Sequence, residues 1–197
     1  MRKLAFMVFC IFLFSSCKKE TEAVVKEPED VYVFQSIKYF LDEGDGLKID
    51  TVSIYSKEFF NTTSIDKSLP LDFLEQSETS QFFINEELPF TLRTNDSLKI
   101  CVPALISDGK IFTGNKKWTY SETEKETLST SSFNSTFSLT ANTKCTIEIF
   151  AIRRNISTSY IAKYIATKTG KVLDVEGKWQ GIQIYSYDTH GVWNPIK

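Results

Sequence analysis

Apolar and polar residues alternate most clearly between Lys99 and Tyr120, and this pattern predicts a β-hairpin. The apolar run that starts at Lys99 ends in the pair Asp108-Gly109, and a second strand-like segment follows from Lys110. Asp-Gly accepts the positive φ angles of a tight two-residue turn, so apolar runs on both sides of it are typical of a hairpin. The expected hairpin occupies about residues 90–120.

Further strands are expected on both sides of this hairpin. Between Thr113 and Thr143, 14 of 31 residues are Ser or Thr, and β-branched Thr favours the pleated conformation. Strand-like segments cover Leu47–Tyr55, residues 61–73, residues 77–84 and Cys145–Phe150, and two strands about a glycine-containing turn are expected in residues 170–185. The expected core residues are Phe133, Phe137, Leu139, Ile147, Ile149, Val175 and Trp179. The pattern therefore predicts an all-β chain.

The segment from Asp30 to Gly44 is the one place where a helix is expected. Val31, Phe34, Ile37 and Leu41 recur near helical spacing, and Gly44 stands where a helix would end. The run from Val31 to Phe34 also suits a strand. We predict a short N-terminal helix, with the strand as the alternative.

The first residues have the layout of an export signal. Arg2 and Lys3 precede an 11-residue apolar run, Leu4–Phe14, which is too short to span a membrane as a helix. The following Ser15-Ser16-Cys17 resembles the lipobox of Bacteroidota lipoproteins, although Phe14 replaces the usual Leu. We expect residues 1–16 to be removed, Cys17 to be lipidated and residues 17–30 to form a flexible tether. The alternative is an ordinary secretory signal with a coincidental Cys. The expected location is the outer membrane, with cell-surface exposure.

Two cysteines remain once Cys10 leaves with the signal and Cys17 carries lipid. Cys101 and Cys145 both lie on expected strands, and export permits a disulfide. A bond between them would pin the base of the hairpin. Two buried free thiols are the equally weighted alternative.

Charge and residue types argue against several functions. Loss of Arg2 and Lys3 lowers the net charge from −2 to −4, whereas nucleic-acid binders carry a basic surface. The single histidine, His190, supplies neither a metal cluster nor a catalytic triad. The acidic residues 42–46 lack the ligand spacing of a calcium loop and are expected to form a solvated turn. We therefore expect no enzyme activity, no metal and no cofactor.

The order of motifs resembles a known toxin family. A Val-Pro segment (Val102-Pro103) precedes the Asp-Gly turn, and the strand after that turn ends in Trp118-Thr119-Tyr120. A Ser/Thr tract, the turn Ala141-Asn142-Thr143 and a Gly-x-Trp-x-Gly strand around Trp179 follow. This succession, over about residues 61–185, resembles the epsilon-toxin and mosquitocidal-toxin branch of the aerolysin-like β-pore-forming proteins. The resemblance implies an elongated, twisted antiparallel β-sheet assembly over residues 31–197.

The resemblance also implies a mechanism: a soluble monomer oligomerises on a target membrane and inserts the hairpin. The residues assigned to lipid contact on the two strands are Leu98, Ile100, Val102, Ala104, Ile106, Phe112, Trp118 and Tyr120. Lys110 and Lys116 share a face with Phe112, and they are tolerable only near the two membrane interfaces. The alternative function is a non-lytic surface lipoprotein that binds a glycan or a protein through the same fold.

Overall fold

The computed structural model describes residues 30–72, 76–85, 98–121, 124–130 and 134–196. The expected signal peptide (1–16), the lipidation site Cys17 and the tether up to residue 29 lie outside these residues. So do residues 90–97 of the expected hairpin and the expected core residue Phe133.

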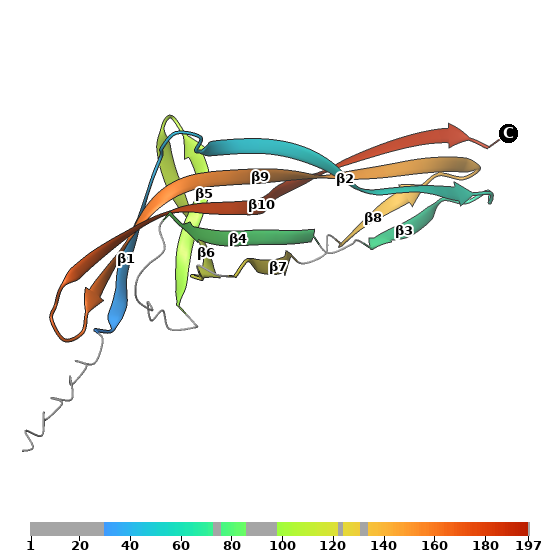
Figure 1. Cartoon of the computed structure of the whole chain (residues 1–197). Coiled ribbons are helices and arrows are strands. Elements are labelled where there is room, and N and C mark those ends of the chain that lie inside the picture. The colour runs from blue at the N-terminus through green and yellow to red at the C-terminus, as the bar shows by residue number, and fades with distance from the viewer. Residues whose placement is uncertain (1–29, 73–75, 86–97, 122–123, 131–133, 197) are drawn as a thin grey trace, which may run out of the picture.

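Two long strands run the length of the molecule. β9 (Thr143–Ala166) and β10 (Val172–Pro195) have 24 residues each and pair antiparallel along almost their whole length. At about 3.3 Å per residue, each strand spans about 80 Å. Figure 1 shows the resulting elongated, twisted shape. The expected pair of short C-terminal strands is wrong, because Gly177 lies within one continuous strand and not in a turn.

The main sheet is built outward from this pair. β1 (Tyr32–Phe40) and β2 (Gly46–Asn61) both pair with β9, one after the other along its length. β4 (Gln76–Ile84) pairs with β10, and β7 (Glu126–Thr130) pairs with β4. All these pairings are antiparallel, and residues 61–84 contribute strands as the sequence predicted.

A second pair of strands continues the β4–β7 pairing toward the far end of the molecule. β3 (Lys67–Asp72) pairs with β8 (Asn134–Leu139). The same offset relates the partners in both pairings: Lys67 lies opposite Leu139 in β3–β8, and Ser80 lies opposite Glu126 in β4–β7. The two pairings therefore share one register.

The elongated shape is held by two separate apolar cores. The central core includes Phe82, Trp118, Tyr160, Tyr164 and Trp179, all at most 1% exposed. The distal core lies where β3 and β8 cover β2 and β9, and it contains Leu71, Leu139, Cys145, Ile147 and Ile149. The expected core residues Leu139, Ile147, Ile149, Val175 and Trp179 are confirmed as buried. Phe137 packs against the distal core while partly exposed.

The expected helix at residues 30–44 is wrong, because Tyr32–Phe40 forms strand β1. The register of β1 against β9 shifts between Phe34 and Ser36, which marks a β-bulge. The extra residue separates the inward-facing Phe34 and Ile37 by three positions instead of two, and both pack against the central core. A bulge in a strand thus produced the spacing that the sequence pattern assigned to a helix.

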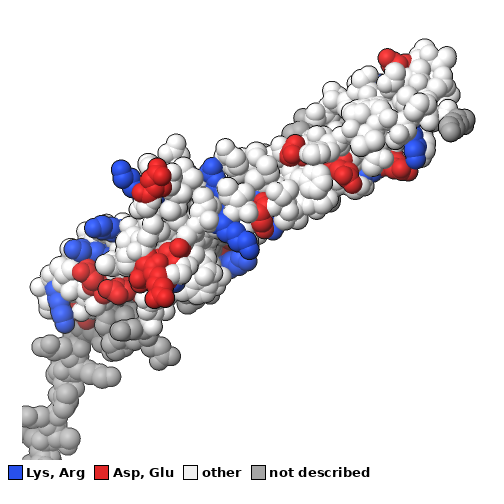
Figure 2. All heavy atoms as spheres, turned by 90° about the horizontal axis from the view of Figure 1, so that it is seen from above, with Lys and Arg blue, Asp and Glu red and all other residues white. Residues whose placement is uncertain are grey.

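Charges are dispersed over the surface. Figure 2 shows Lys and Arg side chains interspersed with Asp and Glu along the face in view. No continuous patch of one sign appears on that face, consistent with the small net charge.

Candidate functional site

The predicted hairpin is present. β5 (Lys99–Ser107) and β6 (Lys110–Thr119) pair antiparallel around Asp108 and Gly109, whose φ angles are 50° and 69°. Two consecutive positive φ values are the property for which an Asp-Gly pair is favoured in a tight turn. In Figure 1 the hairpin crosses the long strands of the main sheet.

One face of the hairpin is buried in the central core. Ile100, Val102, Trp118 and Tyr120 are 9%, 1%, 0% and 1% exposed. The ring of Tyr120 lies 4.7 Å from that of Phe82 and 5.4 Å from that of Phe34, measured between centroids. The Tyr164 and Tyr120 hydroxyls are hydrogen-bonded at 3.2 Å. The apolar face that the sequence assigned to lipid is therefore covered by protein in this state.

The other residues assigned to lipid contact are less covered. Leu98, Ala104 and Ile106 are partly buried, whereas Phe112 is 50% exposed. Register shifts on both sides of Pro103 interrupt the alternation that the sequence predicts for the two strands. Near the turn, Ile106 lies opposite Ile111 and packs against the central core, whereas Phe112 lies opposite Leu105. Cross-strand partners share a face and neighbouring residues alternate, so the expectation that Phe112 and Ile106 share a face is wrong for this state.

Polar contacts hold the hairpin on the main sheet. Arg154 Nη1 donates to the Ala104 carbonyl at 3.1 Å, and Gln183 Nε2 donates to the Pro103 carbonyl at 2.9 Å. The Arg154 guanidinium also lies 3.9 Å from the centre of the Tyr185 ring, a cation–π contact. Sequence reasoning missed both donors, although Arg153-Arg154 in an otherwise apolar strand was an available signal.

Two further contacts involve strands β1 and β4. The Tyr39 hydroxyl donates to the Cys101 carbonyl at 3.3 Å, and burial raises the pKa of Tyr39, so it remains a neutral donor. Lys116, on β6, forms an ion pair with the buried Glu78 of β4. The other carboxylate oxygen of Glu78 accepts from the Ile184 amide at 3.0 Å. The positive charge of Lys116 is thus compensated by Glu78 in this state. Lys110 is exposed at the turn.

The two cysteines are free thiols that lie far apart. Cys101 belongs to the hairpin and touches Tyr39, which is opposite Tyr160 of β9. Cys145 lies fifteen residues before Tyr160 on the same strand, a separation of roughly 50 Å along it. The two sulfur atoms therefore cannot be bonded in this fold, and the disulfide alternative is wrong. Burial raises the pKa of the Cys145 thiol.

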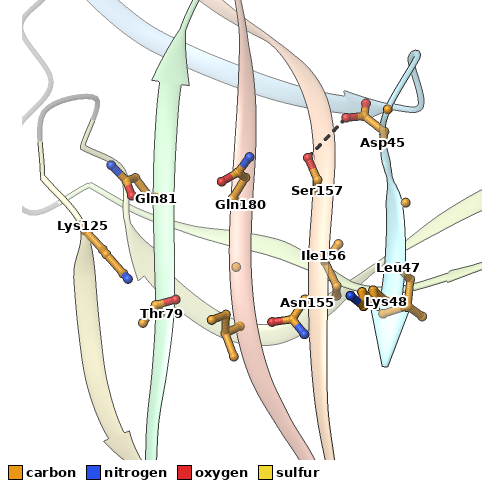
Figure 3. Close-up of a pocket in the computed structure, with 14 residues that line it drawn as sticks. Asp45, Leu47, Lys48, Thr79, Gln81, Lys125, Asn155, Ile156, Ser157 and Gln180 are labelled. Atoms are coloured by element: carbon orange, nitrogen blue, oxygen red, sulfur yellow. Dashed lines mark hydrogen bonds between the residues drawn. The ribbon is translucent and has the colours of Figure 1, made fainter. Parts of the chain in front are cut away.

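A polar pocket lies on the sheet face opposite the central core. It has a volume of about 470 Å³, and Figure 3 shows its lining from β2, β4, β9 and β10 together with Lys125. Gln180 is opposite both Gln81 and Ser157, and Asn155 is opposite Lys48, so neighbouring strands place these side chains in rows. Sequence reasoning did not detect this pocket.

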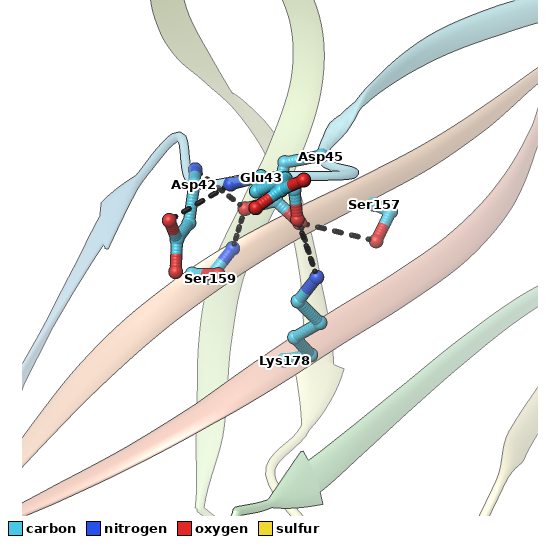
Figure 4. Close-up of polar contacts among 6 residues, drawn as sticks. All are labelled: Asp42, Glu43, Asp45, Ser157, Ser159 and Lys178. Atoms are coloured by element: carbon cyan, nitrogen blue, oxygen red, sulfur yellow. Dashed lines mark hydrogen bonds and ion pairs between the residues drawn. The ribbon is translucent and has the colours of Figure 1, made fainter.

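The acidic turn at residues 42–46 borders this pocket and is not a calcium loop. The carboxylate of Asp45 accepts from the backbone amides of Asp42 and Ser159 at 2.9 and 2.7 Å. Lys178 Nζ lies 3.3 Å from it (Figure 4), and the Asp45 side chain is fully covered. Burial by itself would raise the pKa of Asp45, but the hydrogen bonds from Ser159, Asp42 and Lys178 outweigh it, so the pKa lies below 3.8. The turn is a structural anchor on β9 and β10.

Replacing Asp45 with Asn should therefore destabilise the fold in a pH-dependent way. A depressed folded-state pKa stabilises the protein above the unfolded-state pKa, and this contribution is lost as pH falls through the folded-state value. We expect a loss of about 1.5–3 kcal/mol near pH 7, the range for hydrogen bonds to a charged group. The difference from wild type should shrink below about pH 3.8. Urea denaturation of wild type and variant at about pH 7 and about pH 3 measures the difference in the free energy of unfolding at each pH. A pH-independent difference would contradict the assigned role.

Other candidate chemistry is sparse in the described part of the chain. His190 forms a pair with Asp188 at 2.9 Å on the exposed surface, and this contact lowers the pKa of Asp188. Within the described residues, no group of three or more His, Cys, Asp or Glu side chains is arranged to hold a metal ion. Among the same residues there is no helix with the length and hydropathy needed to cross a membrane.

Comparison with known proteins identifies the fold. No protein-family model and no curated protein sequence matches the chain. Lamprey immune protein matches in structure with a TM-score of 0.53 and 17% identity, over 84% of this chain and 54% of the lamprey chain. This chain thus spans about half the length of the lamprey protein. An aerolysin-like protein of Bombina maxima has a TM-score of 0.48 and 13% identity, over 83% of this chain and 99% of that one. Parasporin-2 of Bacillus thuringiensis has a TM-score of 0.43 and 13% identity, over 83% of this chain and 74% of that one. The chain therefore shares its fold with lamprey immune protein, and its all-β, antiparallel architecture agrees with the elongated aerolysin-type fold that the sequence motifs predicted.

Proposed function

We propose that this protein is a pore-forming-toxin-like protein that oligomerises on a target membrane and inserts the β5–β6 hairpin. Its action requires no catalytic step. The observation that carries the proposal is how the hairpin packs against the rest of the protein. It forms a separate two-stranded sheet with its apolar face against the central core, while Phe112 near the turn is half exposed.

Release of the hairpin is physically accessible because of this arrangement. Among the described residues, β5 and β6 share no backbone ladder with the main sheet. Leaving the sheet breaks a few polar contacts, each worth about 0.5–1.5 kcal/mol net, or about 1.5–3 kcal/mol where a charged group takes part. Exposing Ile100, Val102 and Trp118 to water costs more, because a fully buried apolar side chain contributes about 1.5–3 kcal/mol. An apolar environment such as lipid would offset this loss of burial.

The dimensions of the hairpin suit a membrane. β5 has 9 residues and β6 has 10, and a tilted membrane-spanning strand needs about 9–11. Lys110 and Lys116 lie six residues apart on β6, which is about 20 Å along the strand. At a strand tilt of about 35–45° this separation covers about 15 Å of membrane depth, whereas the apolar band is about 25 Å tall. With Lys110 at one interface, Lys116 would therefore reach the other only by extending its side chain toward the headgroups.

The direct test combines dye release with gel analysis. Purified protein is added to calcein-loaded liposomes of several lipid compositions, and the treated liposomes are run unboiled on SDS gels. We expect calcein release together with SDS-resistant oligomers. Folded, monomeric protein that releases no dye from any composition would contradict the proposal.

The alternative, a non-lytic surface protein that binds a glycan or a protein, is favoured by one observation. The polar pocket on the main sheet is of the size used for small ligands, about 300–1,000 Å³. It lies on the sheet face away from the hairpin, so the two functions are compatible.

A further inference from the structure

The pocket on the outer face of the main sheet has the construction of a ligand site. Its floor is a grid of side chains from β4, β9 and β10, each on a hydrogen-bonded strand and therefore fixed in position. One row places Gln81, Gln180 and Ser157 side by side. The next row places Thr79, Ile182 and Asn155 side by side, with Lys48 of β2 beyond Asn155. A row of four strands is about 14 Å long, since neighbouring strands lie about 4.8 Å apart.

The floor offers hydrogen-bonding groups that are free to bind a ligand. The side-chain amides of Gln81 and Gln180 have no hydrogen-bond partner among the described residues. Each amide provides two donors and a carbonyl acceptor, which matches the donor and acceptor pairs of sugar hydroxyls. Ile182 adds apolar surface of the kind that contacts the C–H face of a sugar ring.

The ends of the pocket are positively charged. Lys48 stands at the β2 side, and Lys125 stands at the β7 side, as Figure 3 shows. Two carboxylates near the β2 side of the pocket already have cationic partners. Asp45 is bound to Lys178 and to the Ser159 amide, and Asp50 is bound to Arg153 at 2.8 Å. The two lysines therefore leave a net positive potential over a floor of neutral amides and hydroxyls.

We propose that this pocket binds a short acidic saccharide, with its hydroxyls on Gln81 and Gln180 and its carboxylate on Lys48 or Lys125. This inference goes beyond the proposed pore formation and does not depend on it, because binding requires neither oligomerisation nor lipid. The row of four strands that forms the pocket floor is about 14 Å long, which accommodates one or two sugar rings.

Titration of the purified protein without membranes tests the proposal, with chemical shifts of the protein amides as readout. The probes are D-glucuronate and N-acetylneuraminate, and methyl glucoside is the neutral control. Both acids are expected to bind saturably, at least about tenfold more tightly than methyl glucoside, a difference of about 1.4 kcal/mol. Raising the salt concentration should weaken the acids selectively, because salt screens an exposed lysine–carboxylate contact.

Four variants locate the site. Lys48→Gln with Lys125→Gln should weaken acid binding at least about tenfold, whereas Lys110→Gln at the exposed hairpin turn should leave it unchanged. Gly46→Trp should block the pocket, because a Cβ at Gly46 meets no atom within 4 Å and Gly46 lines the pocket. Gln180→Met tests the same site should Gly46→Trp fail to fold.

Several results would overturn the assignment. These are absence of saturable shifts with either acid, equal binding of methyl glucoside, and undiminished binding in the double lysine variant. Equal binding of inorganic sulfate would also overturn it, because the site would then recognise charge and not a sugar. None of these outcomes bears on dye release, so failure of this inference and failure of the proposed pore function are distinguishable.

Discussion

Phe112→Asp should abolish calcein release while leaving the soluble fold intact. Phe112 is 50% exposed in the stored hairpin, and surface substitutions usually change stability by about 0.5 kcal/mol or less. The sequence assigns this side chain to lipid in the inserted hairpin, and its cross-strand partner Leu105 is also apolar. The aspartate would lose the lipid contact of the phenyl ring, worth about 1.5–3 kcal/mol when fully buried. It would also add a charge, which costs less than the about 2–4 kcal/mol of a Lys or Arg at the bilayer midplane, and every subunit of an oligomer would carry both losses.

Thr113→Asp is the matched control, because Thr113 is the next residue, is also exposed and points to the opposite face of β6. This variant should release dye like wild type, since a lumen-facing charge stays in water. Melting temperatures of both variants confirm that each is folded. Equal release by the two variants, or equal loss, would argue against insertion of this hairpin face.

Ile100 and Val102 are unsuitable positions for the same test. The sequence assigns both to the lipid-facing side, but they are 9% and 1% exposed in the soluble fold. An aspartate there would leave a buried charge unpaired, so lost activity would report only unfolding.

Gly177→Ala should destabilise the fold by about 3 kcal/mol. A Cβ at this position would lie 2.1 Å from the Phe83 carbonyl oxygen and 2.5 Å from the Tyr160 ring. Neither group can move freely, because Phe83 is in the adjacent strand β4 and Tyr160 is 0% exposed in the central core. Overpacking a core commonly costs about 1–3 kcal/mol, and rigid neighbours push the cost to the upper end.

Gly46→Ala provides the control for this prediction. Gly46 is also a strand residue, yet an added Cβ would meet no atom within 4 Å. We expect a change within about 1 kcal/mol, and of stabilising sign, because alanine restricts the unfolded chain more than glycine does. Urea denaturation of both variants measures the contrast. A Gly177→Ala protein as stable as wild type would contradict the close packing of Tyr160 on the strand.

Local sequence patterns determined the hairpin and part of the core. The hairpin, its turn at Asp108 and Gly109, and the burial of Ile149, Val175 and Trp179 were all predictable, because each depends on alternation or turn preference within a few residues. The aerolysin-like fold followed from the order of such motifs. Lipidation of Cys17 stays a prediction.

Tertiary structure decided what depends on residues distant in the chain. A bulge against β9 made residues 32–40 a strand although their spacing was helical, and the pairing of β1 and β2 along β9 separated Cys101 from Cys145 by roughly 50 Å. The cover on the hairpin's apolar face comes from β1, β4 and β9, and its anchors Arg154 and Gln183 lie 50 and 80 residues away from the carbonyls that they bind. The pocket joins residues near positions 46, 80, 156 and 181. Local alternation determines which side of a strand is apolar, but only strand order and register determine which side chains meet.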